Sequence, residues 1–440
     1  MDRSMEPPSK RIHATENQPM EPPSKRIRGA QDDRLSDLPD CLLHSILSFL
    51  ESRQVVRSSV LSRRWKNIWR SVPCLDIDFT LFRRQARCRS RKCCVTDYGR
   101  MKVCAKEWRP FVEFSDKLFL INSAPSLDRL RIHVPAVNYD DRQACSRWIS
   151  RGVQRSPTVI DIHMDSSWGW GKWFLPDLGS KSYRLTRILL HGVQLDDSFA
   201  EQLRCGYPVL EHLSLVKCFY RIGDIVSGTL THLTIDDCVG HHGFSDGIVV
   251  AAPRLTSLRT SLSTSGWPDG IYVTHTPSLV KASLCVTSWY HTKASFLDNL
   301  YRIFNIPHLE LFGFNMMVNL LQISDKLPQF NNVRTLLINR CDLKTNVNIK
   351  TLDHFLQSMS SLEKLTLQNC EFTDRSKRRT SRAKWRNIAL ESQNLMSFKC
   401  DNLEVIEFKH SKDDGIDELF ELLMGLWRNL GKTNIKLTKV

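Results

Sequence analysis

The apolar residues near the start of the chain, between Leu35 and Trp69, recur at the spacing of short helices. Apolar side chains three or four positions apart lie on one side of a helix. Pro39 suits an early helical position and Asp40 suits the positive end of the helix dipole, so a first helix is expected to begin there. Ser52 and Ser62 are residue types that cap helices. The stretch therefore predicts three short helices.

These helices carry more apolar side chains than one small core can hold. A unit of roughly 35 residues buries too little surface to be stable alone. We therefore expect a second protein to cover part of it. The crowded positions are Leu38, Leu42, Ile46, Leu50, Val56, Leu61 and Trp65.

A different apolar pattern, Leu-x-x-Leu-x-Leu, dominates from Leu127 onward. One unit is ambiguous, because it can open at Ile306 or at Leu309. The alternating end of the pattern predicts a short strand. Since one unit cannot cover its own apolar face, the units are expected to stack as leucine-rich repeats. The other first positions are Leu127, Leu185, Leu210, Leu230, Leu255, Leu279, Val333, Leu362 and Leu403.

Cysteines mark the turn after four of these strands. Cys218, Cys238, Cys341 and Cys370 each lie three residues after the last apolar position of a unit. Leucine-rich repeats place Asn or Cys there, so we interpret these thiols as part of the core. The chain has 14 cysteines and no Asn-x-Ser/Thr sequon, which indicates free thiols in a reducing compartment.

The two patterns together predict a mixed α/β (α+β) fold. An N-terminal three-helix unit precedes an irregular leucine-rich-repeat solenoid with parallel strands and helical or irregular return segments. The expected domains are a disordered basic and Pro-rich tail (1–33), the helical unit (34–80), a basic linker or insertion (81–110), the solenoid (111–370), a basic insertion loop (371–386) and a C-terminal cap (387–440). The tail repeats Met5–Ile12 as Met20–Ile27, and its Lys-Arg pairs are either a nuclear signal or unselected linker.

The net charge of +15 is concentrated in two segments. Residues 81–109 contain ten Lys and Arg against two acidic residues, and residues 373–386 contain seven against one. Such clusters are either solvated loops or patches for an acidic partner. Neither is interleaved with aromatic residues as a base-stacking surface would be. Nucleic acid is therefore the less favoured partner.

Several short motifs suggest chemistry but lack its context. Residues 243–247 match Gly-x-Ser-x-Gly, yet a nucleophile elbow needs a strand before the serine and a helix after it. His241-His242 and the cysteines between 88 and 104 lack metal-ligand spacing. The Trp-rich loop 168–173 is either packed on the solenoid or a recognition patch. We expect no catalytic residue, metal, cofactor or membrane span, and no secretory signal.

The N-terminal block resembles an F-box of the plant type. It carries Asp-Arg-Leu-Ser-x-Leu-Pro-Asp ending at Asp40, Ile-Leu-Ser-Phe-Leu ending at Leu50, and Ser-Val-Leu-Ser-x-Arg-Trp-x-x-x-Trp ending at Trp69. It departs from many members at Glu51, where they have proline. The strand–helix–strand pattern of the last 40 residues, with a helix expected over 416–430, resembles the FBD region of such proteins.

The resemblance implies a non-catalytic substrate adaptor of an SCF-type cullin–RING E3 ubiquitin ligase, in the nucleus, the cytoplasm or both. The F-box would bind the Skp-family linker, and through it cullin and RING subunits, while the repeats would bind an unknown target protein. The alternative is a scaffold or nucleic-acid-binding protein that uses the two basic segments. The linker-facing residues implied by the resemblance are Leu38, Pro39, Leu42, Leu43, Ile46, Leu50, Val56, Leu61 and Trp65.

Overall fold

The computed structural model describes residues 35, 37–84, 105–135, 139–164, 173–179, 181–240, 248–262, 271–274, 276–286, 306–314, 318, 329–341, 343, 346–370, 401–410 and 433–439. Some predictions fall outside these residues. They concern the tail, most of both basic segments, the motif at 243–247, His241-His242, the cysteines between 88 and 104, Trp168, Trp170 and the helix over 416–430.

Three short helices form the N-terminal unit, as the apolar spacing predicts. Its elements are α1 (Asp40–Leu47), α2 (Ser52–Arg57), the 3-10 turn η1 (Ser58–Val60), α3 (Trp65–Ile68) and the 3-10 turn η2 (Trp69–Ser71). Pro39 is the N-cap of α1 and not its first residue. Ser52 is not a cap, because it lies inside α2. Ser62 is not the N-cap of α3, which is Arg64, although its Oγ accepts a hydrogen bond from the Trp65 N–H at 3.4 Å.

One parallel sheet of 13 strands runs through most of the described chain. Its strands are, in order, β1 (Cys74–Asp78), β2 (Arg129–Val134), β3 (Val159–Met164), β4 (Arg187–His191), β6 (His212–Val216), β9 (His232–Asp236), β12 (Ser257–Leu262), β14 (Lys281–Val286), β15 (His308–Phe312), β16 (Thr335–Asn339), β17 (Lys364–Gln368), β18 (Val405–His410) and β19 (Asn434–Lys439). This is the ladder that the leucine spacing predicts.

The return segments carry the helices and two small parallel sheets. The helices are α4 (Phe79–Arg84), α5 (Ala105–Ile121), α6 (Tyr139–Val153), α7 (Asp197–Glu201), the π-turn η4 (Gln202–Gly206) and α10 (Asn346–Gln357). One small sheet contains β5 (Gln194–Leu195), β7 (Phe219–Tyr220) and β10 (Val239–Gly240). The other contains β8 (Asp224–Val226), β11 (Ile248–Ala251) and β13 (Ile271–Thr274).

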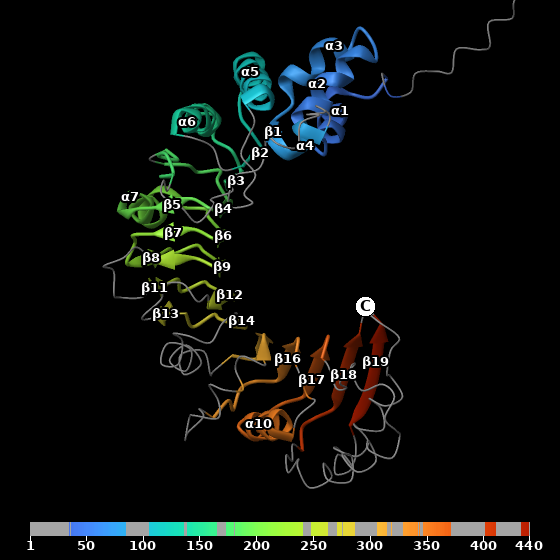
Figure 1. Cartoon of the computed structure of the whole chain (residues 1–440), viewed down its shortest axis with the longest axis vertical. Helices are drawn as coiled ribbons and strands as arrows, with labels where there is room; N and C mark the ends of the chain where they lie inside the picture. Colours follow the sequence, from blue (N-terminus) through green and yellow to red (C-terminus); the bar gives the residue numbers. More distant parts are fainter. Residues whose placement is uncertain are drawn as a thin grey trace, which may run out of the picture.

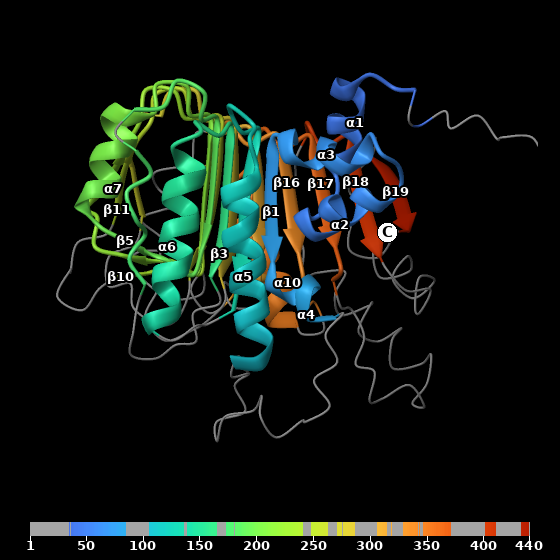
Figure 2. The same ribbon diagram turned by 90° about the horizontal axis from the view of Figure 1, so that it is seen from above.

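The large sheet curves into an arc with the N-terminal helical unit at one end (Figure 1). The strands line the concave side of the arc, and α6, α7 and α10 lie on the convex side (Figure 1). Seen from above, α5 and α6 run alongside the first strands (Figure 2). Alternate side chains of the strands point toward the helices and are almost fully buried, for example Leu130, Ile132 and Val134. The polar residues between them face the concave side.

The strand register corrects the repeat assignment in three places. Leu130 pairs with Ile160, so β3 is a repeat strand that the sequence pattern missed. Leu75 pairs with Leu130, so the sheet begins at β1, before the expected solenoid range of 111–370. Leu309 pairs with Leu336, which assigns the ambiguous unit to Ile306 as its first position.

The cysteines lie where the repeat pattern puts them. Cys218 and Cys238 are buried, and their thiols donate to the carbonyls of Leu190 and Leu215 in the preceding repeat. The residue before each of the four cysteines has a positive φ between 49° and 58°, as a tight turn requires: Lys217, Asp237, Arg340 and Asn369. The expectation of free thiols fails at one pair. Cys341 and Cys370 form a disulfide, because stacked repeats bring their Cα atoms to 4.5 Å.

Candidate partner-binding surfaces

Helix α1 is apolar on two neighbouring stripes, and only one of them is buried. Leu43 and Leu47 are 0–1 % exposed and form a small core with Val55, Trp65, Ile68 and Val72. Leu42, Ile46 and Leu50 follow one another at i, i+4 spacing and are 36–49 % exposed. A helix that is apolar all round is normally buried all round. The exposed stripe therefore has the character of an interface.

The structure sorts the nine predicted contact residues into three groups. Leu43 and Trp65 lie inside the helical unit, so they do not face a partner. Leu38 and Val56 are half-buried against the two cores. The exposed group is Pro39, Leu42, Ile46, Leu50 and Leu61.

Sequence reasoning missed two side chains of the same surface. Phe49 and Val60 are 88 % and 85 % exposed, whereas the most exposed leucine of the predicted set, Leu61, is 64 % exposed. Both stand beside predicted members, Leu50 and Leu61. The spacing rule selects one stripe of a helix, and these two residues lie just beyond the ends of α1 and α2. The sequence signal that could have identified Phe49 and Val60 is an apolar residue next to the end of a predicted helix.

The helical unit is fixed to the first edge of the sheet. The Asp76 N–H of β1 donates to the Ser52 Oγ at 2.8 Å. Arg53 donates to the Phe82 carbonyl at 2.9 Å, and its guanidinium lies 4.3 Å from the Phe82 ring centroid. The Asn122 amide donates to the Val72 carbonyl at 3.1 Å. The edge strand, which would otherwise expose unpaired backbone groups, is thus covered by the unit itself.

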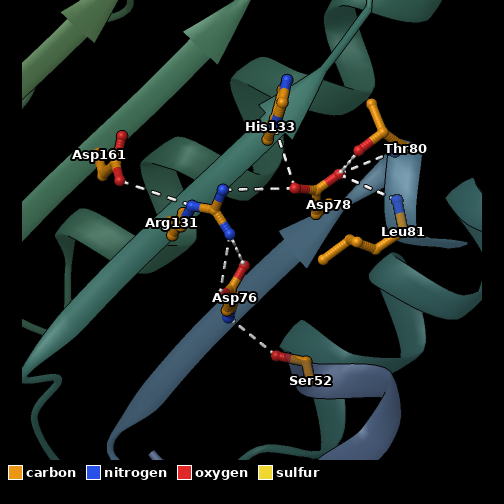
Figure 3. Close-up of polar contacts among 8 residues, drawn as sticks. All are labelled: Ser52, Asp76, Asp78, Thr80, Leu81, Arg131, His133 and Asp161. Carbon is orange, nitrogen blue, oxygen red and sulfur yellow. Dashed lines mark hydrogen bonds and ion pairs between the residues drawn. The ribbon is translucent and has the colours of Figure 1, made fainter. Parts of the chain in front are cut away.

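Arg131 ties the first three strands together on the concave side (Figure 3). Its guanidinium contacts both carboxylate oxygens of Asp76 at 3.1 and 3.2 Å, Asp78 at 3.3 Å and Asp161 at 3.6 Å. Burial raises the pKa of Asp76, and Arg131 only partly opposes this. Burial alone would also raise the pKa of Asp78, but hydrogen bonds from His133 and Thr80 bring it below its ordinary value.

Histidines stack beside this cluster in a column across three strands. The His133 and His163 ring centroids are 4.1 Å apart, and those of His163 and His191 are 3.7 Å apart. Register places all three at the same level of β2, β3 and β4. His212 and His232 form a second stack at 4.3 Å. Their spacing in the sequence carries no recognisable signal, because residues 20–30 apart become neighbours only in the folded ladder.

The described residues contain no group of three or more His, Cys, Asp or Glu arranged to hold a metal ion. No helix within the described part of the chain is long and apolar enough to cross a membrane. Trp173, the described tryptophan of the Trp-rich loop, is 9 % exposed and belongs to the main core. That tryptophan is therefore a packing residue.

Comparison with known proteins places the helical unit and the chain in one family. The family model described as the F-box domain matches residues 35–76. The MEIOTIC F-BOX protein MOF of Oryza sativa subsp. japonica is 30 % identical over 414 residues, which cover 88 % of this chain and 82 % of that protein. The chain belongs to the plant F-box proteins. It is also similar to an FBD-associated F-box protein of Arabidopsis thaliana, with 28 % identity over 77 % of each chain.

A third relative supports the repeat architecture of this F-box protein. F-box/LRR-repeat protein 13 of Arabidopsis thaliana is 30 % identical over 52 % of each chain. The F-box match ends at Asp76, inside β1, so the F-box and the repeat sheet share a strand. F-box proteins are generally non-catalytic adaptors. The exposed apolar residues of α1 and η1 therefore belong to a domain whose general role is to bind a Skp-type partner.

Proposed function

We propose that this F-box protein is the substrate-recognition adaptor of an SCF-type cullin–RING E3 ubiquitin ligase. Its F-box binds the Skp-family linker, and its repeats bind a target protein. The observation that carries the proposal is the second apolar stripe of α1, with Leu42 and Ile46 facing solvent and Leu50 beside them just after the helix, on a domain that already has a complete small core. Burying a fully exposed Leu or Ile side chain is worth about 1.5–3 kcal/mol, and these side chains, which are 36–49 % exposed, have about half of that or less to gain when a partner covers them.

No reactive side chain is needed for this role. The adaptor holds a target close to a ubiquitin-loaded enzyme bound elsewhere in the complex, and the gain comes from effective concentration and orientation. The fixed attachment of α2 to β1 suits this role, since it holds the F-box in one orientation relative to the repeats. The same proposal includes a location in the nucleus, the cytoplasm or both, where the seven described free cysteines would stay reduced and the Cys341–Cys370 disulfide would be open to reduction.

Copurification with a Skp-family linker tests the proposal. We expect the double variant Ile46→Asp/Leu61→Asp to lose the linker, because two charges enter an apolar contact, while its circular dichroism and Tm stay unchanged. A matched control is Val280→Asp/Val347→Asp, which alters two apolar residues that are 42 % and 55 % exposed elsewhere. The control should bind the linker normally. Retention of the linker by the F-box variant, or its loss by both variants, would refute the proposal.

A further inference from the structure

The concave face of the sheet changes charge along the arc. At the described outward positions of β1 to β9, three arginines stand against four aspartates: Arg129, Arg131 and Arg187 against Asp76, Asp78, Asp161 and Asp236. At the described outward positions of β12 to β19 there are five cationic and two acidic side chains. The cationic ones are Arg259, Lys281, Lys364, Lys409 and Lys436, and the acidic ones are Glu310 and Glu407. The net charge of these positions is –1 for β1 to β9 and +3 for β12 to β19, and the part between β14 and β18 carries +1, from Lys281, Lys364 and Lys409 against Glu310 and Glu407.

Two of these lysines are held in place by glutamates one strand further along. The Lys281 ammonium lies 2.6 Å from Glu310, and the Lys364 ammonium lies 2.7 Å from Glu407. Each glutamate also accepts a hydroxyl hydrogen bond, from Ser283 and Thr438 respectively.

In each of these two ion pairs the glutamate side chain is largely buried, whereas the lysine side chain is exposed to solvent. The side chains of Glu310 and Glu407 are only 21 % and 12 % exposed, whereas those of Lys281 and Lys364 are 47 % and 44 % exposed. Burial alone would raise the pKa of Glu310, but the hydrogen bonds from Lys281 and Ser283 lower it, so the carboxylate stays ionised and holds its lysine. An ammonium has three N–H donors, and it can point others at a ligand. Each lysine is thus a cation fixed in position before a ligand arrives.

We propose that the concave face between β14 and β18 binds an acidic, extended segment of the target protein, with one carboxylate on each of these two ammonium groups. The proposal rests on the proposed function in assigning this ligand to the target. Fixed donors lose little conformational entropy on binding, so they favour a ligand of complementary charge.

The spacing of the two lysines defines the ligand further. Lys281 on β14 and Lys364 on β17 occupy the same level of the ladder, three strands apart. Neighbouring strands lie about 4.8 Å apart, so the two sites are separated by about 14 Å. An extended chain advances about 3.4 Å per residue, which matches carboxylates about four residues apart. His308 of β15 and Thr335 of β16 lie between them at the same level, and Leu337 lies two residues further along β16.

A single-stranded nucleic acid fits this surface less well than an acidic peptide. Binding of bases requires exposed aromatic rings for stacking. Phe312 is the only Phe, Tyr or Trp at the described outward positions of β12 to β19. The Arg259 guanidinium lies over its ring, 5.1 Å from the centroid. The surface therefore offers cations without a free stacking platform.

Fluorescence anisotropy with the full-length chain tests the proposal directly and needs no linker or ligase. The probe is a fluorescein-labelled peptide with two glutamates about four residues apart in an Ala-Ser background. We expect it to bind, and to lose binding when its glutamates are replaced by glutamines. We expect Lys281→Gln/Lys364→Gln to raise Kd on the order of tenfold or more, since each lost hydrogen bond to a charged group is worth about that factor. Lys281→Arg/Lys364→Arg should retain most of the binding.

The matched control is Lys117→Gln/Lys350→Gln, which removes two exposed lysines from α5 and α10 on the helical side of the sheet. It should bind the peptide as the unchanged chain does. Equal weakening by both pairs would show non-specific charge attraction and overturn the proposal, as would no preference for the glutamate peptide or tighter binding of single-stranded DNA of similar length. Since linker binding is measured separately, failure of peptide binding leaves the adaptor proposal standing.

Discussion

Glu51 is the residue at which burial and charge conflict most directly. It is the N-cap of α2 and is only 8 % exposed, and its Oε1 has no hydrogen-bond partner among the described residues. Burial raises its pKa above the ordinary value, and the nearby charge of Asp76 adds to the effect. A buried carboxylate without a partner for Oε1 is therefore expected to cost stability when it is ionised.

We predict that Glu51→Gln stabilises the protein at neutral pH. A folded-state pKa above the unfolded value means that the group favours the folded state below about pH 4.3 and that this contribution is lost as the pH rises through the folded pKa. The Tm advantage of the variant, measured by differential scanning fluorimetry, should therefore grow as the pH rises above about 4.3 and level off once the pH has passed the raised folded-state pKa. Glu113→Gln, at an exposed position of α5, is the control and should show no such trend. A pH-independent difference between Glu51→Gln and the unchanged chain would contradict burial of the charged carboxylate as the cause.

The spacing of the apolar residues predicts helix α1, but it does not predict which of the two apolar stripes of the helix is buried. Leu42 and Leu43 are chemically identical, yet one is 49 % exposed and the other fully buried. The choice is made by Trp65 and Val72, which pack on the side of Leu43 from later in the chain. Local sequence holds no information on that contact, and so the interface residues could be proposed only as a mixed set.

At the scale of elements, helix α6 packs tightly against strand β2 at Gly152. A Cβ added to Gly152 would lie 2.5 and 2.6 Å from the two methyl carbons of Leu130, which is fully buried in the ladder. We predict that Gly152→Ala destabilises the protein by about 1–3 kcal/mol through overpacking, although alanine is the better helix former.

Urea unfolding followed by far-UV circular dichroism measures this effect. Gly223→Ala is a suitable control, because its added Cβ would meet no atom within 4 Å. A shift in the urea midpoint for Gly152→Ala alone is the expected result. Unchanged stability of Gly152→Ala would show that α6 moves off the sheet without penalty.

The sequence pattern predicts most of the repeat strands but does not assign two strands, β3 and β1, to the repeat sheet. In β3 the residue aligned with Leu127 is Pro157, which does not match the leucine pattern at its first position. In β1 it is Val72, which matches the pattern as Val333 does, but β1 directly follows the three helices and lies inside the range 34–80 expected for the helical unit. The strand signal itself is present in both, as buried residues at alternate positions of β3 and β1. Whether a strand belongs to a sheet depends on which strand it pairs with. That pairing is seen in the register of the folded chain and not in the composition of the strand.

At the scale of the whole molecule, the two edges of the long sheet are protected by different means. The F-box covers β1, and its Ser52 accepts the Asp76 N–H. At the other end, β19 is the last strand of the described sheet and carries Lys436 and Lys439, both exposed. Lysines on an edge strand oppose pairing with a second chain. The F-box thus also closes the solenoid at its start.

The Cys341–Cys370 disulfide joins two stacked repeats, so its effect on stability should be confined to one end of the arc. Each repeat of a solenoid contacts mainly its neighbours, and stability is therefore transmitted only from repeat to repeat. Closing a loop of 29 residues stabilises by about 3–4 kcal/mol in the chain-entropy description. Reduction should consequently lower the protection of β16 and β17 against hydrogen exchange while leaving β2 to β4 unchanged. The variant Cys341→Ser/Cys370→Ser should behave like the reduced chain and no longer respond to reductant. Loss of protection along the whole arc would instead show that the sheet unfolds as a single unit.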